Sequence, residues 1–260
     1  MANKPKNQPQ PGARAALRQQ QQAQAAADKR ARTAIRVAWI SGLAVIVVMI
    51  GVITWAVVSS RGTNTGVVGA DGLTAPATAT ESGAVAIGDA GAKVTLSVYA
   101  DFMCPYCGEF ERANGDDITA AVDAGTTKLE IHPMAFLDQQ SGGTKFSTRA
   151  ANAFVTVADA DPKVALKYYQ LLYASQPAEG SAGLTDQQLA DLARQAGAPA
   201  DVVATFARQT FVPWVQKITQ QAFDSGITGT PTVKINGEKF AGDVYTRGPL
   251  AQALAQAANG

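Results

Sequence analysis

The stretch Ala100-Asp101-Phe102-Met103-Cys104-Pro105-Tyr106-Cys107 decides how the rest of this chain is interpreted. It follows an apolar run with β character, Val94–Tyr99, and the residues from Pro105 onward have a helical pattern. A strand therefore leads into a turn that opens a helix. The unpaired amides at a helix N-terminus favour a thiolate. Cys104 is thus placed to react, and Cys107, one turn later, is placed to close a disulfide with it.

Other interpretations of this cysteine pair compete with a redox role. The two are the only cysteines in 260 residues. A structural disulfide is disfavoured because a loop of two residues constrains the unfolded chain little. A zinc site needs about four ligands, and beyond the cysteines we find only His132 to supply one. We therefore expect no metal and no cofactor. A third interpretation is a reduced, inert pair of thiols, and it depends on the compartment in which the domain lies.

The N-terminal region predicts a membrane anchor. Residues 1–36 carry eight Lys or Arg and one acid, with almost no large apolar side chain, and predict a disordered cytoplasmic tail. Residues 37–58 carry no charge and would span about 33 Å as a helix. Trp39 and Trp55 lie near its two ends. The basic flank predicts an N-terminus in the cytoplasm and a single-pass cell-membrane protein with its C-terminal domain outside.

The main alternative for this segment is a cleaved signal peptide. Its apolar region would be about 7–15 residues long, shorter than the one here, and Val58-Ser59-Ser60 is a marginal cleavage site. We expect an uncleaved signal-anchor. Residues 59–83, rich in Gly, Thr, Ser and Ala, predict a flexible extracytoplasmic linker. Residues 84–260 then form one domain with a net charge of −5, which argues against nucleic-acid binding.

Within this domain the pattern predicts an α/β fold. Strands are expected at 85–87, 93–100 and 128–134, and the helix after the cysteines is expected to break or kink at Gly115. Strand, helix and strand make a βαβ unit with parallel pairing.

The second half of the domain predicts a helical insertion at about 145–224, in which Thr185 and Gln188 form a capping box. Asn236-Gly237 predicts a tight hairpin between 232–235 and 238–241, and a helix over 249–258 closes the chain.

This order of elements resembles a thioredoxin fold with a helical insertion, the architecture of the DsbA-like thiol–disulfide oxidoreductases. The resemblance covers about residues 85–258. Residues 101–107 look like the active-site segment of that family, and Gly229-Thr230-Pro231-Thr232 looks like its cis-proline loop. The resemblance implies that Cys104 and Cys107 form the redox disulfide, supported by Pro105 and Tyr106.

The resemblance also implies a cis Thr230–Pro231 bond that faces the two sulfurs, with the Thr230 backbone available to bind an extended substrate. One position departs from the family pattern. The family often carries a buried acid six residues before the first cysteine, where this chain has Val98. The proton relay then falls to water or to Asp101, which otherwise serves as a helix cap. We expect His132 to be structural.

The resulting hypothesis is a membrane-anchored extracytoplasmic dithiol oxidase. Its partners would be exported or unfolded polypeptides that contain cysteines, and a separate membrane-embedded, quinone-linked reoxidant of the DsbB or VKOR type. Disulfides form outside the cytoplasm, which supports this direction. Two alternatives stay open: a reductase or isomerase of the same fold, since the direction depends on a reduction potential, and a non-catalytic thioredoxin-like binding module.

Overall fold

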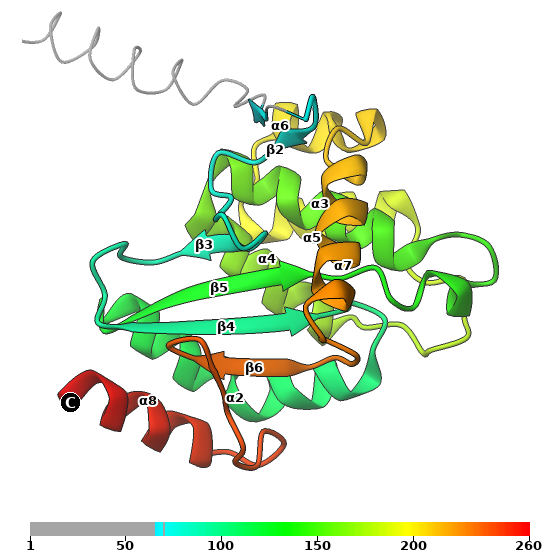
Figure 1. Ribbon diagram of the computed structural model, residues 1–260. Helices are drawn as coiled ribbons and strands as arrows, with labels where there is room; N and C mark the ends of the chain where they lie inside the picture. The colour runs from blue at the N-terminus through cyan, green and yellow to red at the C-terminus, as the bar shows by residue number, and fades with distance from the viewer. Residues whose placement is uncertain (1–65, 70) are drawn as a thin grey trace, which may run out of the picture. The chain divides into compact units, whose positions relative to one another are not determined.

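A five-stranded sheet organises the part of the chain that the computed structural model describes, residues 66–69 and 71–260 (Figure 1). The sheet order is β3-β5-β4-β6-β7, and a separate two-stranded sheet pairs β1 with β2. The strands are β1 (Val67–Val68), β2 (Thr74–Ala75), β3 (Val85–Ile87), β4 (Val94–Ala100), β5 (Thr127–Pro133), β6 (Thr232–Ile235) and β7 (Glu238–Lys239). The helices are α2 (Pro105–Asp123), η1 (Asp138–Ser141), α3 (Phe146–Ala160), α4 (Pro162–Ala174), α5 (Asp186–Ala196), α6 (Ala200–Ala204), η2 (Phe206–Arg208), α7 (Val212–Asp224) and α8 (Pro249–Asn259).

The central strand β4 positions the cysteine motif. It pairs in parallel with β5, from Val94 opposite Thr127 to Ala100 opposite Pro133, and antiparallel with β6. Six of its seven residues are buried, as expected for a strand covered on both faces. The predicted βαβ unit is therefore confirmed, with α2 as its crossover helix.

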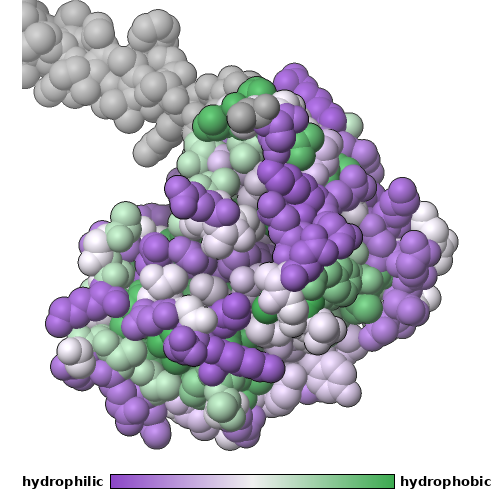
Figure 2. All heavy atoms as spheres, viewed as in Figure 1, coloured by the Kyte–Doolittle hydropathy of each residue, from purple (hydrophilic) through white to green (hydrophobic). Residues whose placement is uncertain are grey.

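Helices cover both faces of this sheet. In the view of Figure 1, α2 lies behind the sheet, where it contacts β5 and α8, and α7 crosses in front of it and contacts β5. Apolar residues of α7 face inward, among them Trp214, Val215 and Ile218. Hydrophilic residues gather over its outer side (Figure 2). This amphipathic pattern is what attaches the helical insertion to the sheet.

Helix α2 is continuous, which corrects the break or kink predicted at Gly115. A glycine in a helix interior costs about 1 kcal/mol relative to alanine. That cost is offset because the same helix buries Phe110, Ile118 and Val122. The Thr119 hydroxyl also donates to the Gly115 carbonyl over 2.8 Å. Packing against the sheet thus overrides the local preference of glycine.

The helical insertion and the hairpin are formed as predicted. The insertion runs from α3 to α7, and α5 begins with a capping box of Thr185 and Gln188. Strands β6 and β7 pair antiparallel across Asn236 and Gly237, whose φ angles are 50° and 87°. Positive φ at both central residues is the geometry that an Asn-Gly hairpin turn requires.

The segment before β3 is packed, which corrects part of the predicted flexible linker at 59–83. The buried carboxylate of Asp159 in α3 accepts hydrogen bonds from the amides of Ala77, over 2.6 Å, and Gly66, over 3.2 Å. Lys217 of α7 forms an ion pair with Asp71. Residues 66–69 and 71–83 therefore form part of the folded unit, because the helical insertion supplies partners that their composition does not reveal.

Three predictions concern residues outside the described part of the chain. These are the cytoplasmic tail at 1–36, the transmembrane helix at 37–58 and the start of the linker at 59–65. Within residues 66–69 and 71–260, no helix combines the length and the apolar character that crossing a membrane requires.

Candidate active site

Cys104 is the N-cap residue of α2, and Pro105 occupies the first helical turn, as the sequence predicts. The Cys104 carbonyl accepts hydrogen bonds from the amides of Cys107, over 3.0 Å, and Gly108, over 3.3 Å. Both cysteines are free thiols in this structure. Cys104 is 6% exposed and Cys107 is fully buried, so attack from outside can reach only the first of the two.

The Thr230–Pro231 loop faces Cys104. The bond between the two residues is cis, and the Cys104 thiol donates to the Thr230 carbonyl oxygen over 3.2 Å. The loop reaches this position because β6, which begins at Thr232, pairs with the end of β4 at Tyr99. Antiparallel pairing thus brings together two motifs that lie 126 residues apart.

The two thiols have opposite pKa shifts. The pKa of Cys104 is lowered from 9.0 to about 6, first by a hydrogen bond from the Cys107 thiol and further by the Thr230 side chain and the amides of Cys107 and Tyr106. Burial opposes this lowering. The pKa of Cys107 is raised well above 9.0, first by burial and then by its hydrogen bond to Cys104 and by the charge of Cys104. Cys104 is therefore the thiolate, and Cys107 the proton-bearing partner.

Asp101 is buried behind the motif and does not cap α2, which corrects the predicted helix-cap role. Its Oδ1 accepts from the Met103 amide over 2.8 Å and from the Ser147 hydroxyl over 2.7 Å. Its Oδ2 accepts from the Leu137 amide over 2.9 Å. Asp101 directly follows β4 and lies three residues before the N-cap Cys104, and its side chain turns into the core and joins three segments of the chain.

Burial raises the pKa of Asp101 to about 6, against the effect of its hydrogen bonds to Met103, Ser147 and Leu137. The charge of Cys104 contributes a further, smaller rise. A carboxyl group that titrates near neutral pH beside the thiols is chemically suited to exchange a proton, so Asp101 stays a candidate for the relay.

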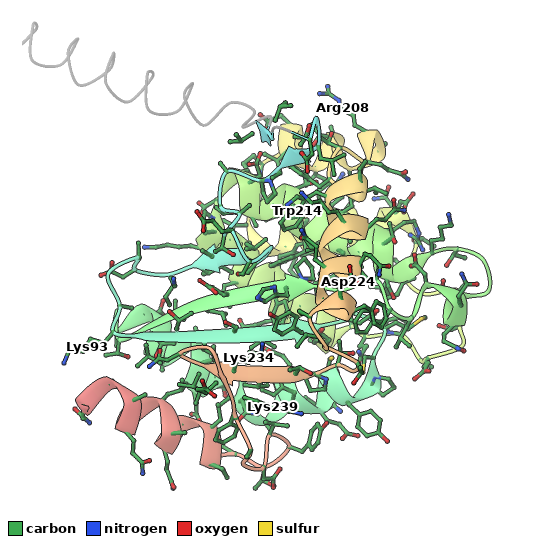
Figure 3. All side chains as sticks on the ribbon, viewed as in Figure 1. Lys93, Arg208, Trp214, Asp224, Lys234 and Lys239 are labelled. Atoms are coloured by element: carbon green, nitrogen blue, oxygen red, sulfur yellow. The ribbon has the colours of Figure 1, made fainter. Side chains whose placement is uncertain are left out.

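Val98, which stands where the family often has an acid, and His132 both lie in the apolar framework. Val98 is buried in β4 between Ile131 and Val233 of the neighbouring strands. The ring of His132 stacks on Tyr99 at 3.8 Å, and burial lowers the pKa of His132 to about 3. Lys234, labelled in Figure 3, lies over the other ring of this pair, 5.5 Å from the centre of Tyr99. His132 is thus a neutral, packed side chain, in agreement with the structural role predicted for it.

An aromatic cluster joins the motif to the helical insertion. The buried Phe102 ring lies 5.4 Å from Tyr173 and 5.7 Å from Tyr169 and Phe154. The Tyr173 hydroxyl donates to the Asp101 carbonyl over 3.2 Å. On the solvent side, Tyr106 is 59% exposed, and its ring centre lies 6.0 Å from that of Tyr245. The exposed aromatic pair forms a rim beside Cys104.

Several of these residues were not identified from the sequence, among them Ser147, Tyr173 and Tyr245. They lie in helices and loops far along the chain from the motif and belong to no recognisable pattern. No group of three or more His, Cys, Asp or Glu side chains suited to a metal ion occurs in the described ranges.

Comparison with known proteins identifies the family. A thioredoxin family model matches residues 80–248. The oxidised crystal structure of Mtb DsbA is 27% identical, with a TM-score of 0.56 over 67% of this chain and 99% of that one. MdbA from Corynebacterium matruchotii, a thiol-disulfide oxidoreductase, is also 27% identical, with a TM-score of 0.55 over 66% of this chain and 89% of that one. BdbD from Bacillus subtilis shares the fold. It is 22% identical, with a TM-score of 0.59 over 72% of this chain and 98% of that one.

A curated relative matches a shorter part. Serine/threonine-protein kinase PknE of Mycobacterium tuberculosis is 38% identical over 118 residues, which cover 44% of this chain. The match spans only 21% of the kinase's own length. The family model, in contrast, covers more than half of the chain and includes both the cysteine motif and the proline loop. Together with the DsbA-like structures, this shows that the chain belongs to the thioredoxin family, among its DsbA-like members.

Proposed function

We propose that this chain is a thiol–disulfide oxidoreductase that acts outside the cytoplasm as a dithiol oxidase of exported proteins. The observation that carries the proposal is the position of Cys104, at the N-cap of α2 and against the cis Thr230–Pro231 bond, with Cys107 buried one turn behind it. The lowered pKa of Cys104 and the raised pKa of Cys107 agree with these positions. A thiolate stabilised only in the reduced protein favours the dithiol over the disulfide, and this makes the disulfide an oxidant. The thiol-disulfide oxidoreductases among the similar structures support the reaction class.

The reaction exchanges one disulfide for another. A substrate thiolate attacks Cys104 of the Cys104–Cys107 disulfide, and Cys107 leaves as a thiolate and takes up a proton. A second substrate thiolate then attacks the substrate sulfur of the mixed disulfide and releases Cys104 as its thiolate. The substrate has lost two electrons and the enzyme has gained them. The exposure of the two sulfurs supports Cys104 as the atom attacked, because Cys104 is 6% exposed and Cys107 is fully buried.

The reduction potential tests the direction of this reaction. Equilibration of the purified protein with glutathione buffers should give a potential well above the roughly −270 mV of thioredoxin and toward the roughly −120 mV of DsbA. A potential near that of thioredoxin would reject the oxidase and favour the reductase or isomerase of the same fold. A binding module would keep its partner after Cys104 is alkylated, whereas an oxidoreductase would lose turnover.

The proposed location is the outer side of the cell membrane, with residues 37–58 as an uncleaved anchor. The basic flank before this segment supports that orientation. A separate membrane-embedded, quinone-linked oxidant would then accept the electrons from the dithiol, since this chain carries no cofactor motif.

Protease treatment of intact spheroplasts tests this location. We expect release of a stable fragment that begins near residue 66 rather than near residue 84, because residues 66–69 and 71–83 pack on the helical insertion. As a control, lysed spheroplasts should give the same fragment. Protection of the domain in intact spheroplasts, with cleavage only after lysis, would place it in the cytoplasm.

A further inference from the structure

A glutamine of the helical insertion donates two hydrogen bonds to the active-site turn. Gln176 follows α4, whose last turn it extends by donating its backbone amide to the Tyr173 carbonyl over 3.2 Å. Its side-chain Nε2 donates to the Cys104 carbonyl over 2.8 Å and to the Phe102 carbonyl over 3.1 Å. One amide group therefore ties the carbonyls at both ends of the Phe102–Cys104 segment to a loop more than 70 residues away.

Gly108 leaves the space that this side chain occupies. A Cβ at position 108 would lie 2.1 Å from Oε1 of Gln176 and 3.1 Å from Nη1 of Arg112. Real Cβ atoms do not approach other atoms to 2.1 Å, so any larger residue at position 108 must displace the Gln176 amide. The Gln176 amide therefore occupies this position only because residue 108, buried on α2, is a glycine.

The Cys104 carbonyl connects the Gln176 hydrogen bond to the residue that carries the reactive thiol. The same oxygen accepts hydrogen bonds from the amides of Cys107 and Gly108 in the first turn of α2. Gln176 is a further donor to this oxygen and holds the Cys104–Pro105 peptide group in place at the N-terminus of α2, beside the amides of Cys107 and Tyr106 that lower the pKa of Cys104. We infer that Gln176 is a positioning residue for the thiol chemistry of Cys104, and that Gly108 supplies the room for its amide. For turnover the inference rests on the proposed function, but for thiolate formation it does not.

The chain offers a matched control for testing this role. Gln170 lies on α4 itself, and its Nε2 donates to the Thr119 hydroxyl on α2 over 2.9 Å. Gln170→Ala removes one glutamine amide between the same two helices, but at a distance from the first turn. Gln176→Ala and the isosteric Gln176→Met both remove the donors to the two carbonyls. Gly108→Ala should displace the amide while leaving residue 176 unchanged.

The experiment is a pH titration of the ultraviolet thiolate absorbance of the purified, reduced protein. We expect Gln176→Ala, Gln176→Met and Gly108→Ala each to raise the pKa of Cys104 by roughly half to one unit, a modest shift because the lost hydrogen bonds act on the thiol only through the main chain. At a pH below the midpoint this leaves about three- to tenfold less thiolate. Gln170→Ala should titrate like the wild type. The double variant Gly108→Ala/Gln176→Ala should shift no further than Gln176→Ala alone.

Two results would overturn the inference: unchanged titration of the folded Gln176 variants, or an equal shift in Gln170→Ala. If Gln176→Ala and Gln176→Met do not fold, Gly108→Ala decides by itself, because a folded, unshifted protein would reject the role. A shifted pKa in a protein that neither oxidises nor reduces thiols would reject the proposed function and leave the inference standing. Normal turnover with an unchanged pKa of Cys104 in the Gln176 variants would reject the inference and leave the proposed function standing.

Discussion

Replacement of Cys104 by serine should reduce thiol–disulfide exchange to the background rate. Serine cannot form a mixed disulfide, and the remaining Cys107 thiol is fully buried with a pKa raised well above 9.0. The thiolate is the attacking species in this chemistry, so Cys107 alone should react very slowly near neutral pH. Oxidation of a reduced, unfolded model substrate, followed by the loss of free thiols, measures the effect.

Replacement of Cys107 by serine should instead trap substrates. Cys104 keeps its low pKa in part, because a serine hydroxyl can still donate the hydrogen bond that is the largest cause of the lowering. No second sulfur is then available to release the mixed disulfide from within the protein. We expect covalent complexes that disappear on reduction, visible on non-reducing gels and identifiable by mass spectrometry.

These two variants control each other. The chain has only two cysteines, so each variant carries a single thiol and every mixed disulfide can be assigned to one sulfur. Cys107→Ala is a further control, because it removes the donor and should trap substrate more slowly than Cys107→Ser. Capture by Cys104→Ser together with none by Cys107→Ser would reverse the roles assigned to the two cysteines.

The stability of the reduced protein should increase with pH relative to that of the oxidised protein. The pKa of Cys104 is about 6 in the folded dithiol and 9.0 without the fold, whereas the disulfide has no thiol to titrate. A lowered pKa stabilises the folded state only where the thiolate is present. The contribution of Cys104 is therefore absent well below pH 6 and grows as the pH rises from 6 toward 9. Above about pH 9 the raised pKa of Cys107 opposes it, because that thiol then ionises only in the unfolded protein.

The size of this effect follows from the same values. The lowering of the pKa from 9.0 to about 6 corresponds to at most about 4 kcal/mol of unfolding free energy. Solvent near the partly accessible thiol reduces that figure. About one third of the maximum is present one pH unit above the folded pKa, near pH 7. The disulfide adds a contribution to the oxidised form that does not depend on pH, so the slope is the more direct test.

Urea unfolding of both redox forms between about pH 5 and pH 9 measures this slope. Asp101, whose pKa is raised to about 6, titrates in both forms and largely cancels in the difference. The single-thiol variant Cys104→Ser lacks the low-pKa thiol, so its stability should not show the added rise between pH 6 and pH 9. A difference between reduced and oxidised protein that stays constant over this range would show that Cys104 is not a stabilised thiolate, and the oxidase proposal would lose its support.

The sequence by itself determined the features that depend on neighbouring residues. Pro105 at the start of α2 and the capping box at Thr185 are local signals, because the groups that interact lie within one helical turn. The Asn236-Gly237 turn is equally local. Alternating and helical patterns then placed β4, α2 and β5 in a parallel unit, and the spacing of the two cysteines identified the site.

Only the tertiary structure decided what surrounds that site. Asp101 is a buried acceptor rather than a helix cap because α3 and the segment after β5 bring Ser147 and Leu137 to it. Gln176 reaches the Cys104 carbonyl only because α4 packs against α2. Residues 66–69 and 71–83 are held by Asp159 and Lys217, which lie far along the chain. Such contacts depend on the three-dimensional path of the chain. No short-range pattern encodes them, because the donor and the acceptor lie far apart in the sequence and meet only when the helices pack.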